Sequence, residues 1–258
     1  MTKITSISTS DQPARPAAVG SYFALACAIT WALATPVAWA WLRHQTPSQL
    51  AIASLGFSAF GPLVATLIVA RRDEWPAVFG RFRTAPQWVF LALLAPPAIH
   101  LVARLLCAAL GSPPAAWLHP PVTPETLAAL VVFPLGEEFG LRGYAQPRLV
   151  ARFGAVRGPL LLGVLWCVWH LAYAVLPDGS YNFQEIAVGM LELPLYSVLI
   201  AWTMKHAQQS MWVAIAFHAG GHLDHIERDP GASLPLHLCH VAVLLVLAGF
   251  AARSSRPA

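Results

Sequence analysis

Long apolar runs separated by short polar loops fill the chain from residue 22 onward. A helix needs about 20 apolar residues to cross the hydrocarbon core of a bilayer. Runs of this kind cover residues 22–42, 50–70, 88–110, 123–139, 159–176, 186–204, 211–223 and 234–251, of which the fourth and seventh are short and polar at one end. Because backbone groups in lipid must bond within their own segment, the pattern predicts an all-α, polytopic membrane helical bundle of about eight transmembrane helices.

The basic residues predict how this bundle is oriented. With eight spans, all Lys and Arg residues but three fall at one side of the membrane. The opposite side has only Arg43 and Arg228, and Arg104 lies within the third span. Basic residues favour cytoplasmic loops, so both termini are expected in the cytoplasm, with the loops at 112–121 and 178–184 outside.

Composition agrees with a membrane protein and excludes several other classes. The chain is 57% hydrophobic and 11% charged, with a mean hydropathy of +0.59. Soluble domains carry about 25% charged residues, so a soluble enzyme and a disordered chain are both excluded. The net charge of +4 lies in the short loops, where it sets topology, and no nucleic-acid partner is expected.

One membrane domain is expected, in contact with membrane lipid. Residues 1–20 form a polar cytoplasmic tail without the apolar core of a cleavable signal, residues 21–253 form the eight-helix domain, and residues 254–258 form a second tail. We expect an integral protein of the bacterial cytoplasmic (inner) membrane. The four cysteines lie in apolar runs and form no CxxC pair, which argues against disulfides and a thiolate zinc site.

Ionisable residues at membrane depth are costly and usually face a cavity or a partner, so they mark candidate chemistry. The first group is Gly-Glu-Glu-Phe-Gly-Leu-Arg-Gly-Tyr at residues 136–144. Glu138 and Arg142 are four residues apart and can pair along one helix face. Glu137 points about 100° away and lacks that partner, which suits a general base. The alternative is a juxtamembrane charge pair that ends a helix.

The second group lies in the fifth predicted span. His170 has apolar residues on both sides, and Trp166 precedes it by one helical turn on the same face. A structural histidine bonded to a backbone carbonyl or a neighbouring helix is the alternative interpretation.

The third group is histidine-rich. His218 and His222 are four residues apart, and His225 follows on the same face. His-x3-His is a spacing found in helical zinc sites, but the HExxH of zincins is absent. The alternative interpretation is a hydrated helix end rich in polar residues. This alternative suits His225 better than His218. If the three groups converge, a Glu-His-His set can hold and deprotonate a water, directly or through a metal.

The order and spacing of these motifs resemble the CPBP family of CAAX prenyl endopeptidases and bacteriocin-processing, Abi-like membrane proteins. The match rests on EEFGLRGYAQPRL at residues 137–149, on Trp166-x3-His170 and on His218-x3-His222, with Phe60-Gly61-Pro62 as a further feature. The resemblance runs from about residue 22 to residue 224.

The resemblance implies an intramembrane endopeptidase, often called a metalloprotease, with a cavity open to the cytoplasmic side. Glu137 would activate water, and His170 would position it. Glu138 and Arg142 would support the motif helix, with Trp166 beside them. His218 and His222 would stabilise the oxyanion or complete a metal site, in which case Glu137, His170, His218 and His222 are the candidate ligands of a zinc ion. A metal-free mechanism has also been argued for CAAX members, so no cofactor is certain.

This chain departs from the family at His222, where Asn or Asp is usual. A neutral His can donate a hydrogen bond or bind zinc, so activity is compatible with the change. The expected substrate is a peptide or protein, prenylated or membrane-bound. Two other functions fit the same residues: a catalytically inactive scaffold or bacteriocin-immunity protein of the same fold, and a transporter. No repeat or pair of broken helices favours transport.

Overall fold

The computed structural model describes the chain except for residues 1–16, 115–116, 118–123, 175–182, 225–233 and 256–258. Within the described part every regular element is a helix, which confirms the all-α prediction. The predicted tail at residues 1–20 lies outside the described residues up to residue 16, and so does His225.

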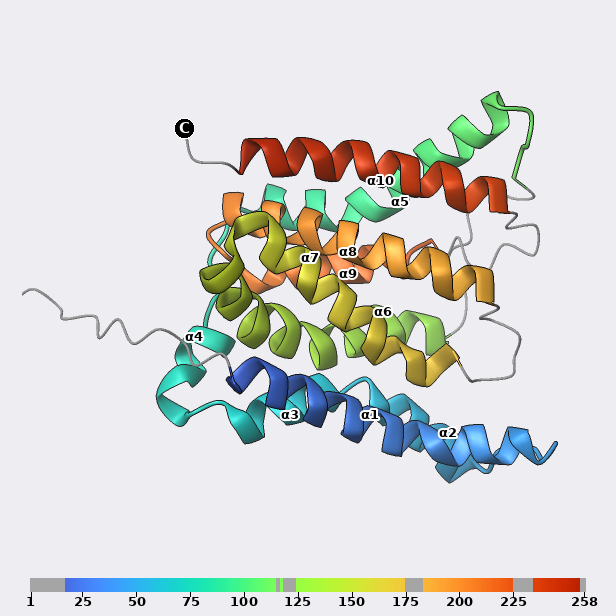
Figure 1. Cartoon of the computed structure of the whole chain (residues 1–258), viewed down its shortest axis with the longest axis vertical. Helices are drawn as coiled ribbons and strands as arrows, with labels where there is room; N and C mark the ends of the chain where they lie inside the picture. Colours follow the sequence, from blue (N-terminus) through green and yellow to red (C-terminus); the bar gives the residue numbers. More distant parts are fainter. Residues whose placement is uncertain (1–16, 115–116, 118–123, 175–182, 225–233, 256–258) are drawn as a thin grey trace, which may run out of the picture.

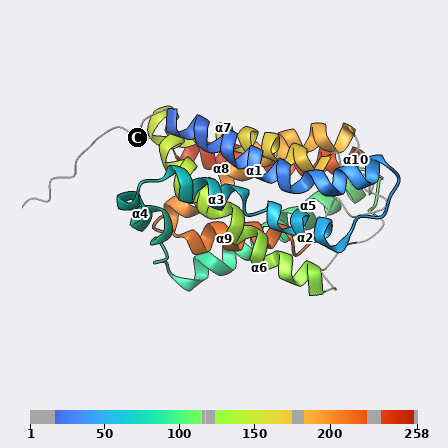
Figure 2. The same cartoon turned by 90° about the horizontal axis from the view of Figure 1, so that it is seen from below.

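The helices form an elongated bundle with their axes roughly along its length (Figures 1 and 2). In chain order they are α1 (Ala17–Leu42), α2 (Gln49–Ser58), α3 (Gly61–Val69), η1 (Arg72–Glu74), α4 (Trp75–Phe79), α5 (Pro86–Ala109), α6 (Pro124–Glu138), η2 (Phe139–Ala145), α7 (Gln146–Ala174), α8 (Phe183–His206), α9 (Met211–Gly221) and α10 (Leu234–Ser254). Each predicted span therefore coincides with a helix or, at residues 50–70, with the pair α2 and α3.

Length and composition alone mark fewer candidate spans among the described residues than the eight helices expected. Among the described residues, four helical stretches are long and apolar enough to span a membrane, or five if α2 and α3, bent by 56°, count as one. The predicted spans at 123–139 and 159–176 are joined, because α6 continues through η2 into α7 and forms one candidate stretch, Leu130–Tyr173. α9 has only 11 residues, too few for a crossing, and α8 is not among the candidates.

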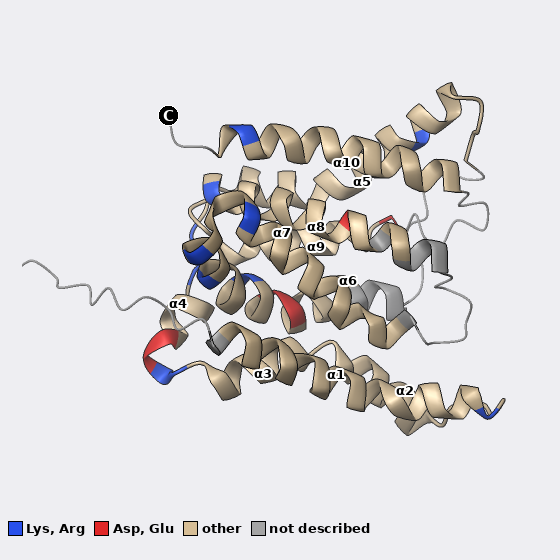
Figure 3. Cartoon of the chain, viewed as in Figure 1, with Lys and Arg blue, Asp and Glu red and all other residues tan. Residues whose placement is uncertain are grey.

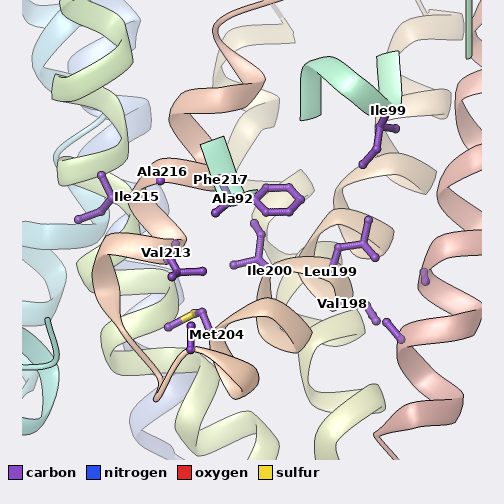
Figure 4. Packing of buried hydrophobic residues seen from close by; sticks show 14 of the residues in the cluster. Ala92, Ile99, Val198, Leu199, Ile200, Met204, Val213, Ile215, Ala216 and Phe217 are labelled. Carbon is purple, nitrogen blue, oxygen red and sulfur yellow. The ribbon is translucent and has the colours of Figure 1, made fainter. Parts of the chain in front are cut away.

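The helices pack in two groups, one of α1, α2 and α3 and the other of α5, α8, α9 and α10. α1 packs on α2 and α3, while α5 packs on α9, and α10 packs on both α5 and α8. α7 joins the groups by contacting α1 and α8. In one core cluster, Ala92 of α5, Ile200 of α8 and Phe217 of α9 are all buried (Figure 4). These contacts hold α9, the short helix that carries His218, inside the bundle.

Charged residues are sorted between the two ends of the bundle. Figure 3 shows most of the Lys and Arg residues at the end where α10 finishes, and α1 starts at that same end (Figure 1). Fewer Lys and Arg residues lie toward the other end (Figure 3). This is the asymmetry on which the predicted orientation depends.

Candidate active site

A wide helical turn positions the acidic motif. α6 ends at Glu138, and the chain continues as a π-helix over Phe139–Ala145 before α7 begins. π-Helical turns inside α-helices are rare and are frequent at functional sites. Arg81, from the loop before α5, donates to the carbonyls of Arg142 (3.0 Å) and Gly143 (3.3 Å). Burial lowers the pKa of this loop guanidinium.

Two glycines let the motif helix lie directly on the break between α2 and α3. A Cβ at Gly136 or Gly140 would come within 2.6 Å of a backbone oxygen, that of Ala59 or Pro62. Because neither oxygen can move without displacing the backbone, a larger residue is excluded at both positions. This contact explains why Phe60-Gly61-Pro62 accompanies the acidic motif.

Glu138 is fully buried, and one of its carboxylate oxygens contacts both the Arg142 guanidinium and the His218 ring. Arg142 donates to Glu138 Oε1 at 3.2 Å, which confirms the predicted pair. His218 Nδ1 contacts the same oxygen at 2.8 Å, a bond the sequence did not predict. An ionised carboxylate only accepts, so Nδ1 of His218 carries the hydrogen. Arg142 also donates to Ser197 Oγ at 3.1 Å, which ties the motif to α8.

Glu137 binds the indole of α7 instead of Arg142. Trp166 Nε1 donates to Glu137 Oε2 at 2.9 Å, and Glu137 is only 4% exposed. The guanidinium carbon of Arg142 lies 4.4 Å from the centre of the Trp166 ring, on its face. Trp166 therefore contacts two of the three charged residues of the motif, Glu137 and Arg142. The prediction that Glu137 would point away from Arg142 agrees with these bonds.

His170 is oriented by its own helix. Its Nδ1 lies 3.0 Å from the Trp166 carbonyl oxygen, which can only accept, so Nδ1 is the donor. In the neutral ring, Nε2 then has the lone pair. The bond from His170 to a backbone carbonyl, which the structural interpretation predicted, is thus present. The same bond places the hydrogen on Nδ1, which is the tautomer that a water-positioning role requires.

His218 and His222 are adjacent on α9, as their spacing predicted. Their rings stack with centroids 5.1 Å apart and an angle of 25° between the planes. His222 caps the C-terminus of α9, and its ring contacts Phe133 of α6. α6, α7 and α9 therefore bring the acidic and histidine motifs together.

These residues meet at a cavity of about 190 Å³ between α5, α7, α8, α9 and α10. One wall is formed by Trp166, His170, His218 and His222. Glu137 is not among the lining residues, but it is bonded to Trp166, which is one of them.

The described side chains show no preformed metal centre. Among the residues that the structure describes, no three or more His, Cys, Asp or Glu side chains are grouped closely enough to hold a metal ion. His218 Nδ1 is bonded to Glu138, and His170 Nδ1 to a backbone carbonyl, so each ring can bind a metal only through Nε2. Cys27, Cys107, Cys167 and Cys239 form no disulfide in the described part of the chain.

The opposite wall contains polar residues that the sequence had not assigned to a site. Glu192 Oε1 of α8 lies 2.9 Å from His240 Nδ1 and 3.6 Å from His237 Nδ1. His237 and His240 of α10 are buried, with 6% and 1% of their surface exposed. The sequence signal that could have revealed this group is the spacing of the two histidines, which are three residues apart in an apolar helix and so lie on one face.

Comparison with known proteins agrees with the motif-based resemblance. Residues 119–223, which contain all the site residues on α6, α7 and α9, match the family model described as type II CAAX prenyl endopeptidase Rce1-like. This segment resembles a CAAX prenyl endopeptidase. CAAX prenyl protease 2 of Methanococcus maripaludis is 30% identical over 89 residues, which are 32% of this chain and 32% of that relative. The match thus spans about a third of the length of the curated relative.

Proposed function

We propose that the protein is an intramembrane endopeptidase that hydrolyses a peptide bond near the cytoplasmic face of the membrane. The observation that carries the proposal is the bond from Trp166 to Glu137 beside the three imidazoles of one cavity wall. A buried carboxylate next to oriented imidazoles is the arrangement that water activation requires. The similarity of residues 119–223 to CAAX prenyl endopeptidases supports the same reaction.

In this mechanism Glu137 accepts a proton from the attacking water as the new C–O bond forms. His170 Nε2 accepts a hydrogen bond from the other O–H of the water, and this bond directs the water oxygen at the carbonyl carbon. Glu137 then passes its proton to the leaving nitrogen as the C–N bond breaks, which yields a carboxylic acid and an amine. Each transfer is a general acid–base step of the kind that contributes about 10² to 10⁴ in rate.

The α9 histidines stabilise the negative charge that develops on the carbonyl oxygen. His218 Nδ1–H is used by Glu138, so its Nε2 donates to that oxygen when the ring is an imidazolium. The Glu138 carboxylate stabilises this cation, as an acidic residue does beside a catalytic histidine. His222, stacked on His218, supplies a second donor.

The proposed substrate is a membrane-associated peptide with a prenylated CAAX tail, since the relative is named a CAAX prenyl protease. The experiment uses purified protein in lipid nanodiscs and a farnesylated CAAX peptide, with cleavage followed by mass spectrometry. We expect the wild type to cleave and Glu137→Gln to be inactive but normally folded. Glu74→Gln is the matched control, because Glu74 lies in η1 outside the cavity. Full cleavage by folded Glu137→Gln would contradict the mechanism, and an inactive wild type would favour a scaffold.

A further inference from the structure

A second pocket, of about 350 Å³, lies where α8 and α10 end. The residues that line it come from the loop before α5, the start of α7, the end of α8 with the turn after it, and the residue directly after α10. None of them lines the cavity that contains the histidine motif. Most of the Lys and Arg residues gather at this same end of the bundle (Figure 3). Because the ends of membrane-spanning helices lie at the level of the lipid headgroups, lipid is the nearest source of ligands for this pocket.

Both charged residues that line this pocket are cations. Arg81 comes from the loop before α5, and Lys205 lies in the last turn of α8. Gln209 and Ser255 add polar groups, and no Asp or Glu is among the lining residues that the structure describes. The dipole of α8 accounts for a lysine at its C-terminus, so Arg81 is the stronger evidence for a ligand. Two cations without a carboxylate between them attract an anion, and Arg and Lys are the usual phosphate-binding residues.

Arg81 is held in place before any ligand binds. Its Nη2 donates to the carbonyls of Arg142 and Gly143, and its own backbone carbonyl accepts the N–H of Met211 at 2.6 Å. Its Nε is buried and has no hydrogen-bond partner among the described residues. Nη1, for which the described residues provide no acceptor, is therefore the nitrogen that remains for a ligand. A guanidinium with unused donors beside a pocket is uncommon in a folded protein and is expected where an anion binds.

The rest of the pocket wall is largely apolar. Val150, Ala151 and Ala155 line it from α7. Ala151 and Ala155 are exposed, and Val150 is half-buried. A ligand that fills the pocket therefore places an anionic group on Arg81 and Lys205 and an apolar chain along α7. A free phosphate ion matches only the first of these surfaces, whereas a phospholipid matches both.

We propose that this pocket binds an anionic phospholipid, with the Arg81 guanidinium and the Lys205 ammonium on its phosphate and one acyl chain against α7. Basic pockets between membrane helices are typical binding sites for such headgroups. Because Arg81 also bonds to the carbonyls of Arg142 and Gly143, the lipid is held next to the acidic motif without sharing a residue with the cavity. The site is therefore separate from the one proposed for hydrolysis.

The test measures lipid binding without a peptide, so its result does not depend on the proposed endopeptidase activity. The purified protein is equilibrated with phosphatidylglycerol or with phosphatidylcholine of identical acyl chains, and native mass spectrometry counts the lipids that stay bound. We expect phosphatidylglycerol to be retained in preference to phosphatidylcholine. Lys205→Gln should weaken phosphatidylglycerol binding about fivefold, as expected for one basic residue at an anionic headgroup. Since Lys205 is exposed, this variant should fold normally.

Two further variants separate the pocket from general attraction to the basic end of the bundle. Arg83→Gln is the matched control, because Arg83 is exposed and has the same charge but does not line the pocket, and phosphatidylglycerol affinity should stay unchanged. Ala151→Trp fills the pocket without changing its charge and should lower that affinity.

Three results would refute the site. They are equal retention of the two lipids, equal losses in Lys205→Gln and Arg83→Gln, and unchanged binding in Ala151→Trp. Inorganic phosphate tests the source of the anion and should not displace the lipid, because it lacks the chain that packs on α7. Displacement by inorganic phosphate would assign the pocket to a free phosphate and refute the phospholipid.

Discussion

Trp166 donates a 2.9 Å hydrogen bond from its indole nitrogen to Glu137 Oε2, and the same ring packs against the Arg142 guanidinium. One aromatic residue of α7 thus holds the proposed base and contacts the cation of the neighbouring ion pair. Because Trp166 also lines the cavity, its bond links Glu137 Oε2 to the cavity wall.

Trp166→Phe tests this role directly. The phenyl ring keeps most of the packing but loses the N–H donor, so Glu137 loses its orienting bond. We expect kcat to fall about tenfold, in line with one lost hydrogen bond to a charged group, with a smaller change in KM. Trp202→Phe is the matched control, since Trp202 donates its indole N–H to Ser254 at the surface. Equal kcat values for the two variants and the wild type would show that the Trp166 bond has no catalytic role.

Glu138→Gln is expected to damage folding more than Glu137→Gln does. Glu138 is fully buried and bonded to both Arg142 and His218, so an amide there leaves the Arg142 charge without its counter-ion. Breaking a buried ion pair typically costs about 3–5 kcal/mol. Arg142→Ala should act in the same direction.

Folded yield and thermal unfolding in detergent measure this difference. Asp73→Asn is the control, because it breaks an ion pair with Arg71 in which both side chains are exposed, and such a pair is worth about 0–1 kcal/mol. If Glu138→Gln unfolds at the wild-type temperature, the ion pair does not stabilise the motif helix.

His222→Asn distinguishes a hydrogen-bond donor from a metal ligand. An Asn amide at the same position, one turn after His218, offers a neutral donor of similar reach, so activity should be retained or increased. If His222 were a metal ligand, Asn would be a poor replacement, and activity would fall together with bound metal. We expect the donor result. Activity is measured beside the zinc content of the purified protein, and an inactive, metal-depleted variant would refute the donor role.

The orientation in the membrane can be tested by cysteine labelling in intact cells. All four native cysteines are first removed, and single cysteines are then placed at Ser112, at Ser180, which lies outside the described residues, and beside Arg81. The basic end of the bundle should be cytoplasmic, so Ser112 and Ser180 should react with an impermeant reagent and the Arg81 position should not. The reverse pattern would overturn the predicted topology.

The local pattern of the sequence was sufficient for the helices and for the contacts within one helix. Apolar runs located every predicted span on a helix, since the cost of unpaired backbone in lipid leaves few alternatives. The spacing of Glu138 and Arg142 predicted their ion pair, and the spacing of His218 and His222 predicted their proximity. These are neighbours within one helical turn, which a helical period determines without any tertiary information.

Contacts between helices were decided only by the tertiary structure. The bond from His218 to Glu138 joins α9 to α6, and Glu192 is paired with His240 across α8 and α10. The break between α2 and α3 and the π-helix after Glu138 depend on close packing that no single segment encodes. The sequence by itself therefore determined which residues are costly in a membrane. Which of them share one cavity followed from how the helices pack, because burial forces each polar group to find its partner on whichever helix lies beside it.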